Sequence, residues 1–100
     1  MAKYTSRLSE EDRLDIEFDT EKNKVVHFIV QYSSITPKGW RTIIRYDTAH
    51  GAAHKDVYCY SKKKKVRQEI LGKDFNAVFT QAQEDIKKNW EKIKENYLFQ

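Results

Sequence analysis

The stretch KVVHFIVQYSSITPKGWRTIIRYD, residues 24–47, decides the fold of this 100-residue chain. Apolar side chains fill its even positions from 26 to 32, and this period of two predicts a strand over about residues 24–35. Residues 36–39 (Thr-Pro-Lys-Gly) have the composition of a type I or type II turn. A second strand is predicted over residues 40–47, and so short a connection makes the two strands antiparallel neighbours.

The same alternation extends the predicted sheet toward the N-terminus. Leu14, Ile16 and Phe18 are separated by acidic residues, which is typical of a strand with one buried face. Residues 20–23 supply a turn between this strand and the next. Residues 1–12 are polar and lack the alternation, so we expect a flexible N-terminus there.

Toward the C-terminus the pattern predicts one or two more strands and then a helix. A strand over residues 55–61 returns from a loop at residues 49–54, and residues 66–70 form either a fifth strand or an extended connection. Asp74 is placed to cap the helix. The apolar stripe of the helix steps by three and four residues: Phe75, Val78, Phe79, Ala82, Ile86, Trp90, Ile93 and Tyr97. We therefore predict an α+β fold in a single domain over residues 1–100: a four- or five-stranded antiparallel meander packed against one long C-terminal helix.

The composition limits the partners and the location that we expect for this protein but does not identify a function. A net charge of +4 permits an anionic partner such as RNA or an acidic protein, but does not require one. The single cysteine, Cys59, cannot form an intramolecular disulfide and is expected to be a small packing residue. No apolar run is long enough for a signal peptide or a membrane span, so we expect a cytoplasmic protein without membrane contact. Residues 95–100 resemble the protease site of an expression tag with Tyr and Leu exchanged, but Tyr97 continues the helical stripe, so we treat them as native.

Residues 45–56, RYDTAHGAAHKD, hold the densest polar chemistry of the chain. Two imidazoles, two carboxylates and a guanidinium fall within twelve residues, around a Gly-Ala-Ala segment too small to fill a core. A structural turn needs only Gly, Asn, Asp or Pro, so the cluster predicts that something polar is bound or transformed here. Arg45 and Asp47 should share one strand face, and the hairpin should bring Asp47 near Asp56. We expect His50 and His54 at its tip.

Several chemistries fit these residue types. Paired histidines with a carboxylate suit zinc or another transition metal, which would make a metal-dependent hydrolase, although the His-x-x-x-His spacing suits a helix better than a loop. Two imidazoles also suit metal-independent cleavage of RNA, with one as general base and the other as general acid. A third interpretation is purely structural: the histidines are solvated, and Asp47 pairs with Arg45 or Lys55 at little gain in stability.

We take ribonuclease chemistry without a cofactor as the main hypothesis. His50 and His54 would be the acid/base pair, Asp47 would orient an imidazole, and Arg45 would contact phosphate. The expected substrate-binding residues, including two from the basic run 62–65, are Tyr46, Lys55, Asp56, Lys63 and Lys64. His27, on the preceding strand, could approach the same side. The rival hypothesis is a non-enzymatic module that binds protein or nucleic acid, and an exposed edge strand also leaves a homodimer open.

Residues 46–54, Tyr-Asp-Thr-Ala-His-Gly-Ala-Ala-His, resemble the TumE-type toxins of prokaryotic toxin–antitoxin modules. Those toxins carry a Tyr-Asp-Asn-Ala-His-Gly-type segment, a second histidine a few residues later, and an Asp-Phe-rich, helical C-terminal region. Here Thr48 replaces the more usual Asn, and Lys55 stands in place of a third histidine. These differences also fit membership of a related, uncharacterised prokaryotic family that shares only the hairpin with the toxins. The resemblance implies an RNA-directed toxin held in check by a protein antitoxin, with these site residues: Tyr46, Asp47, His50 and His54.

Overall fold

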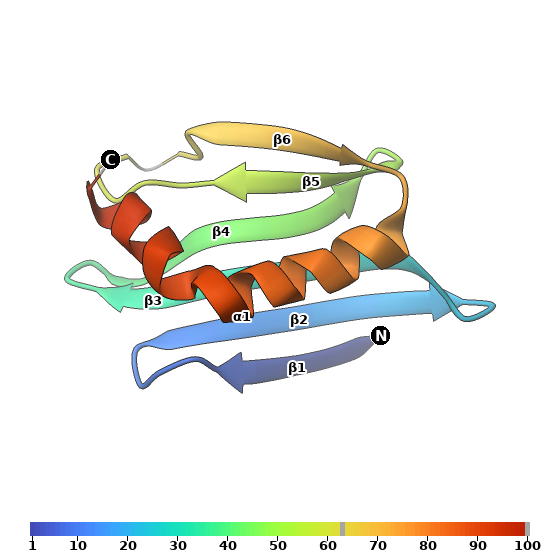
Figure 1. The fold of residues 1–100 in the computed structure, drawn as a ribbon, viewed down its shortest axis with the longest axis horizontal. Helices are drawn as coiled ribbons and strands as arrows, with labels where there is room; N and C mark the ends of the chain where they lie inside the picture. The colour runs from blue at the N-terminus through green and yellow to red at the C-terminus, as the bar shows by residue number, and fades with distance from the viewer. Residues whose placement is uncertain (63, 100) are drawn as a thin grey trace.

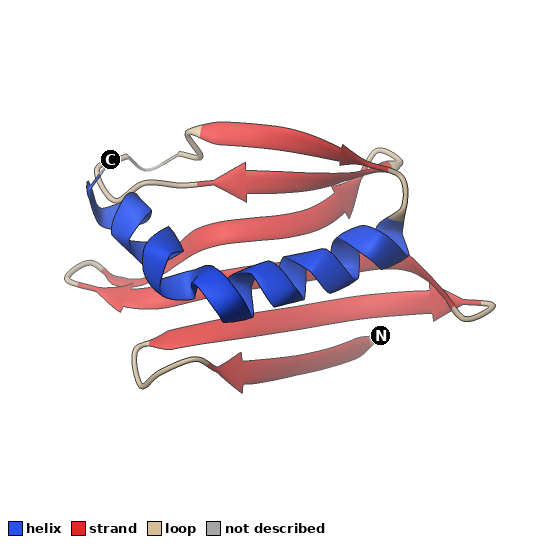
Figure 2. Cartoon of the chain, viewed as in Figure 1, coloured by secondary structure: helices blue, strands red, loops and turns tan. Residues whose placement is uncertain are grey.

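The computed structural model describes residues 1–62 and 64–99. Within these residues, six strands form one antiparallel sheet in chain order, and one helix follows them (Figures 1 and 2). The strands are β1 (Ala2–Arg7), β2 (Asp12–Glu21), β3 (Lys24–Thr36), β4 (Gly39–Ala49), β5 (Ala52–Val57) and β6 (Arg67–Gly72), and the helix is α1 (Phe75–Phe99). The predicted α+β class is confirmed, and the sheet has six strands rather than four or five.

The helix α1 lies across one face of the sheet and contacts β3, β4 and β5 (Figure 1). The helix begins where predicted. Asp74 caps its first turn, because the carboxylate accepts a hydrogen bond of 3.1 Å from the amide of Ala77. The core between helix and sheet consists mainly of alternate strand residues and the predicted helical stripe: Leu14, Ile16, Phe28, Val30, Tyr32, Ile44, Tyr46, Val78, Ala82, Ile86 and Tyr97. In the described part of the chain, no helix combines the length and the apolar character that crossing a membrane requires.

The first strand, β1, occupies residues predicted to be a flexible N-terminus. It pairs with β2 along its whole length, from Ala2 opposite Phe18 to Arg7 opposite Arg13. Its sequence lacks an apolar alternation because the strand lies at the sheet edge, where α1 barely reaches it. Tyr4 is the exception, since its hydroxyl donates a hydrogen bond of 3.4 Å to Gln83 of α1.

The segment after β5 also differs from the prediction. The strand predicted to run to residue 61 ends at Val57, and residues 58–62 and 64–66 are not part of a strand. Cys59 lies in this irregular segment and is buried, as expected of a small packing residue. The amide of Tyr60 donates a hydrogen bond of 2.9 Å to the carbonyl of Tyr97, so the segment leaves the sheet to join the end of α1.

A buried carboxylate at the start of β2 also connects the sheet to α1. Asp12, only 2% exposed, accepts hydrogen bonds of 2.6 Å from the hydroxyls of Tyr32 and Ser9, and Lys94 of α1 lies 3.4 Å away. Burial alone would raise the pKa of Asp12, but hydrogen bonds from Ser9, Tyr32 and Ser34 and the Lys94 charge outweigh it and lower the pKa. The ionised carboxylate is therefore the form that the fold stabilises.

Asp12→Asn should lower the free energy of unfolding at pH 7 by about 1.5–3 kcal/mol, because it weakens hydrogen bonds to a charged group. The lowered pKa means that this contribution is present above the unfolded value near 3.9 and is lost as pH falls through the folded value. Urea denaturation at pH 7 and pH 3 measures both effects, and the difference between wild type and variant should shrink at pH 3. Asp19→Asn, which removes a surface ion pair, is the control. Equal losses in the two variants would contradict the assignment.

Candidate functional site

The β4–β5 hairpin is tighter than the sequence predicts. Only His50 and Gly51 form its turn, with φ angles of 51° and 78°, and Ala49 pairs directly with Ala52. Positive φ at both central positions is the geometry that matches the twist of antiparallel strands. The predicted loop over residues 49–54 is therefore wrong, because its second half belongs to β5.

The register of this hairpin fixes which side chains meet. Asp47 lies opposite His54, and Arg45 lies opposite Asp56. Side chains alternate along a strand, so all four project from the sheet face that α1 leaves uncovered, whereas Tyr46 faces the helix. The prediction that Arg45 and Asp47 share one face is confirmed: the guanidinium Nε lies 3.2 Å from the carboxylate of Asp47.

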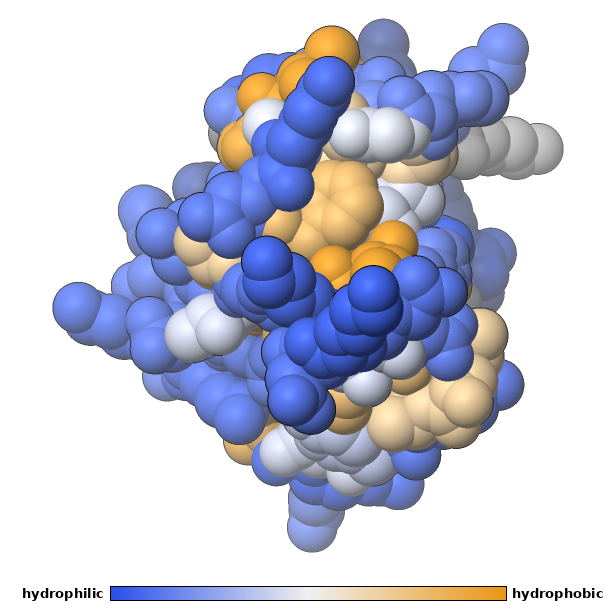
Figure 3. Space-filling view, turned by 90° about the vertical axis from the view of Figure 1, so that its right-hand side faces the viewer, coloured by the Kyte–Doolittle hydropathy of each residue, from blue (hydrophilic) through white to orange (hydrophobic). Residues whose placement is uncertain are grey.

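The open face of the hairpin is hollowed beside the turn. Seven residues line a cavity of about 350 Å³, which we call the hairpin hollow: Asp47, Ala49, His50, His54, Asp56, Lys65 and Gln68. The buried carboxylate of Asp56 accepts a hydrogen bond of 2.7 Å from Gln68 and lies 3.5 Å from the ammonium of Lys65. The surrounding end of the molecule is covered mostly by hydrophilic residues (Figure 3).

The two imidazoles of the hairpin hollow have different environments. Nε2 of His54 lies 3.0 Å from the carbonyl oxygen of Ala49, and because a carbonyl only accepts, this nitrogen carries the proton. Nδ1 of His54 is buried and has no hydrogen-bond partner among the described residues. His50, by contrast, is exposed at the turn. Only His50 therefore exposes its ring freely to solvent, and His54 secures the hairpin by bonding to its backbone.

Two predicted substrate-binding residues lie on the opposite side of the sheet. Tyr46 and Lys55 pair across β4 and β5, one residue out of phase with Asp47 and His54, so they face α1. The Tyr46 hydroxyl donates a hydrogen bond of 2.8 Å to Asp85 of α1, and burial, this bond and the Asp85 charge raise its pKa. The Lys55 ammonium lies 3.8 Å from Glu69. Grouping Tyr46 and Lys55 with the histidines is therefore incorrect, because strand alternation separates the two sets.

The basic run 62–65 and His27 supply fewer side chains to the hairpin hollow than predicted. Lys63 lies outside the described residues, and Lys64 is exposed between β5 and β6. Their neighbour Lys65, which had no individual role in the prediction, lines the hairpin hollow. His27 does not line the hollow, because its Nδ1 lies 2.8 Å from the hydroxyl of Thr48.

Comparison with known proteins places the chain in a family. A family model described as a domain of unknown function (DUF7718) matches residues 1–100. The chain belongs to this family. No curated protein and no solved structure matches it. The description of the DUF7718 family gives no activity.

The hypothesis of a metal site depends on where the His, Cys, Asp and Glu side chains lie. Among residues 1–62 and 64–99 of this DUF7718 chain, no group of three His, Cys, Asp or Glu side chains is placed to hold a metal ion. The carboxylates of the hairpin hollow instead pair with Arg45, Lys65 and Gln68. The structure brings Asp47, His50, His54 and Asp56 together around one polar hollow. Sequence reasoning missed Gln68, because only the β5–β6 register brings it opposite Asp56.

The two histidines should differ in what they contribute to stability. His54→Ala removes the bond to the Ala49 carbonyl and should cost about 0.5–1.5 kcal/mol. His50→Ala changes an exposed side chain without altering the Cβ at a positive φ, so its effect should stay within about 0.5 kcal/mol. Chemical denaturation of both variants at one pH measures the difference. A His50→Ala variant as unstable as His54→Ala would refute this division of roles.

Proposed function

We propose that this protein is a small toxin-type protein that cleaves RNA at the hairpin hollow without a metal. The observation that supports this most is the convergence of an exposed imidazole, two carboxylates and an ammonium around one cavity. These groups suffice for proton transfer and for neutralising a phosphate. The toxin part of the proposal, the protein antitoxin and a cytoplasmic location rest on the resemblance of residues 46–54 to TumE-type toxins.

The geometry suggests a different role for each hollow residue. His50 is the group available as general base, removing the proton of a ribose 2′-hydroxyl so that its oxygen attacks the adjacent phosphorus. Lys65 is 45% exposed and would balance charge that develops on the phosphate oxygens. His54 would supply a proton to the departing 5′-oxygen only as the imidazolium, protonated at both ring nitrogens, and only after Nε2–H releases the Ala49 carbonyl. This transfer leaves the neutral ring. In the hairpin as it stands, His54 is therefore a positioning residue.

Arg45 would act beside the hollow rather than in it. Its guanidinium bonds to Asp47 and lies 3.4 Å from the side-chain oxygen of Gln31, on the open face. It also lines a neighbouring cavity of about 450 Å³ over β1, β2 and β3. An RNA strand leaving the hairpin hollow along the open face would meet this cation, so Arg45 fits a contact to a flanking phosphate.

A second candidate is a non-enzymatic binding module, which one observation favours. The edge strand β6 carries exposed apolar side chains, with Ile70 72% exposed and Leu71 38% exposed. Apolar residues also show at the height of β6 in Figure 3. An unpaired strand edge with apolar side chains suits addition of a strand from a partner protein, including an antitoxin or a second copy.

Cleavage of single-stranded RNA in the presence of EDTA is the direct test. The wild type should produce fragments with a 2′,3′-cyclic phosphate and a 5′-hydroxyl, and His50→Ala should slow this by about 10²–10⁴-fold, the usual value of a general base. His27→Ala makes the same chemical change outside the hollow and serves as the control. RNA that is bound but never cut would favour the binding module over the ribonuclease.

Expression in a permissive bacterial host tests the toxin part separately. Wild-type protein should arrest growth on induction, and His50→Ala should relieve the arrest at equal protein level, because growth arrest would require RNA cleavage. Growth curves with quantified protein measure this. Unimpaired growth with abundant soluble wild-type protein would contradict a toxin.

A further inference from the structure

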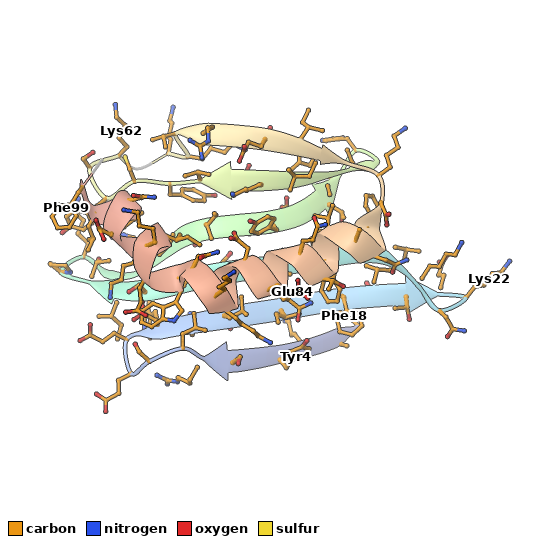
Figure 4. The ribbon with its side chains drawn as sticks, in the orientation of Figure 1. Tyr4, Phe18, Lys22, Lys62, Glu84 and Phe99 are labelled. Atoms are coloured by element: carbon orange, nitrogen blue, oxygen red, sulfur yellow. The ribbon has the colours of Figure 1, made fainter. Side chains whose placement is uncertain are left out.

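Another hollow lies at the end of the molecule opposite the β4–β5 turn. Its volume is about 450 Å³, and it forms where the β3–β4 turn, the start of β4, the segment after β5 and the end of α1 meet. Figure 4 shows Lys62 and Phe99 at this end and Lys22 at the other. Three cations and three phenols dominate its lining: Lys38, Arg41, Lys62, Tyr58, Tyr60 and Tyr97. We call this the aromatic–basic hollow.

The tyrosines give the hollow an ordered aromatic wall. The rings of Tyr60 and Tyr97 pack edge to face, with centroids 6.1 Å apart and planes at 68°. The backbone hydrogen bond between Tyr60 and Tyr97 holds this contact in place. Tyr58 and Tyr60 are only partly buried, so apolar ring surface remains open to a ligand.

The cations of this hollow differ from most others near the sheet. Elsewhere Arg13, Arg45 and Lys65 each pair with an aspartate. Among the described residues, none of Lys38, Arg41 and Lys62 forms an ion pair with a carboxylate, and no lining residue of the hollow is acidic.

Each of these cations is instead held by weaker neutral contacts or is exposed. The Lys38 ammonium lies 4.3 Å from the Tyr60 ring centroid and donates to the Tyr60 carbonyl at 3.3 Å. Arg41 donates to the carbonyl of Trp40 at 3.1 Å. Burial raises the pKa of Tyr97 and the positive charge of Arg41 opposes the rise, and both side chains line the same hollow. Positive charge therefore converges on an aromatic wall without a carboxylate to neutralise it.

We propose that the aromatic–basic hollow binds a nucleotide, with the phosphate on Arg41, Lys62 and Lys38 and the base against the tyrosines. Both halves of such a ligand have a matching surface: phosphates prefer Arg and Lys donors, and a base stacks on aromatic rings. The volume lies within the range of small-molecule sites, about 300–1,000 Å³. The ligand is a free nucleotide or one nucleotide of a single-stranded RNA.

This proposal is independent of the ribonuclease proposal. Arg41 lies near the start of β4 and Asp47 six residues later, which is about 20 Å along a strand. The hairpin hollow opens on the uncovered face, whereas the aromatic–basic hollow reaches the end of α1 through Tyr97. The two hollows are therefore separate, and either can bind if the other does not.

An amide chemical-shift titration at about 50 mM salt tests the site, because phosphate contacts weaken steeply at higher salt. The probes are 5′-AMP, adenosine, inorganic phosphate and a uridine decanucleotide RNA. AMP or the RNA should give saturable shifts at Lys38, Arg41, Tyr60 and Lys62. Adenosine and phosphate alone should each bind at least about tenfold more weakly than AMP, because each loses one half of the contacts. Shifts from RNA alone would identify an RNA contact, and shifts from AMP would identify a nucleotide site.

Variants make the test specific to this hollow. Arg41→Ala and Lys62→Ala should each weaken binding by about tenfold or more, the usual effect of losing one charge-assisted hydrogen bond. Lys87→Ala removes the same charge from an exposed position on α1 and should bind like wild type. Tyr60→Phe keeps the ring and should bind like wild type, whereas Tyr60→Leu should weaken binding while the remaining amide spectrum stays folded.

Three outcomes would overturn the proposal. The first is that no probe gives a saturable shift at low salt. The second is that Arg41→Ala and Lys62→Ala bind as tightly as Lys87→Ala. The third is that inorganic phosphate binds as tightly as AMP and the RNA. The titration is repeated with His50→Ala, in which the shifts at Lys38, Arg41, Tyr60 and Lys62 should be the same as in the wild type. Binding that survives in this variant separates the nucleotide site from any failure of the hairpin hollow to cleave RNA.

Discussion

A single helix covers a single face of the sheet, and this constraint assigns every strand residue to one of two environments. Along β4, Tyr46 points toward α1 and bonds to Asp85, while its neighbours Arg45 and Asp47 point to the open face and bond to each other. Along β5, His54 and Asp56 take the open face. The polar groups of the candidate site can lie beside one another because, within residues 1–62 and 64–99, no second helix covers that face, where apolar side chains would otherwise be required.

Charge is distributed over this scaffold in two different ways. Where carboxylates are buried, each has a close donor: Asp12 accepts from Tyr32 and Ser9 near Lys94, and Asp56 accepts from Gln68 near Lys65. Such groups must be satisfied because an unpaired buried charge is costly. The cations of the aromatic–basic hollow form no ion pair with a carboxylate of the described residues. This contrast separates charges that hold the fold from charges that are available to a ligand.

The sequence predicts the parts of this structure that repeat with a period. The alternation in β2, β3 and β4 and the stripe of α1 identify the core, because burial on one face imposes that period. β1 was not predicted, because it is an edge strand that α1 barely contacts and its sequence therefore has no apolar alternation. The composition of residues 45–56 predicts the candidate site but not its geometry. The turn consists of only His50 and Gly51, so His54 belongs to β5, and the pairing of β5 with β6 adds Gln68. Register and turn length are set by tertiary pairing, which one sequence does not display.

In the proposed function, RNA binds on the open face of the β4–β5 hairpin. The test of this binding site is a map of amide shifts with a single-stranded RNA analogue lacking the 2′-hydroxyl, which cannot be cleaved by attack of that group. Binding at this site should shift the amides of Asp47, His50, His54 and Asp56 and of the facing Lys65 and Gln68, and should leave the exposed amides of α1 unchanged. Saturable binding that leaves all of these hairpin amides unshifted would contradict it.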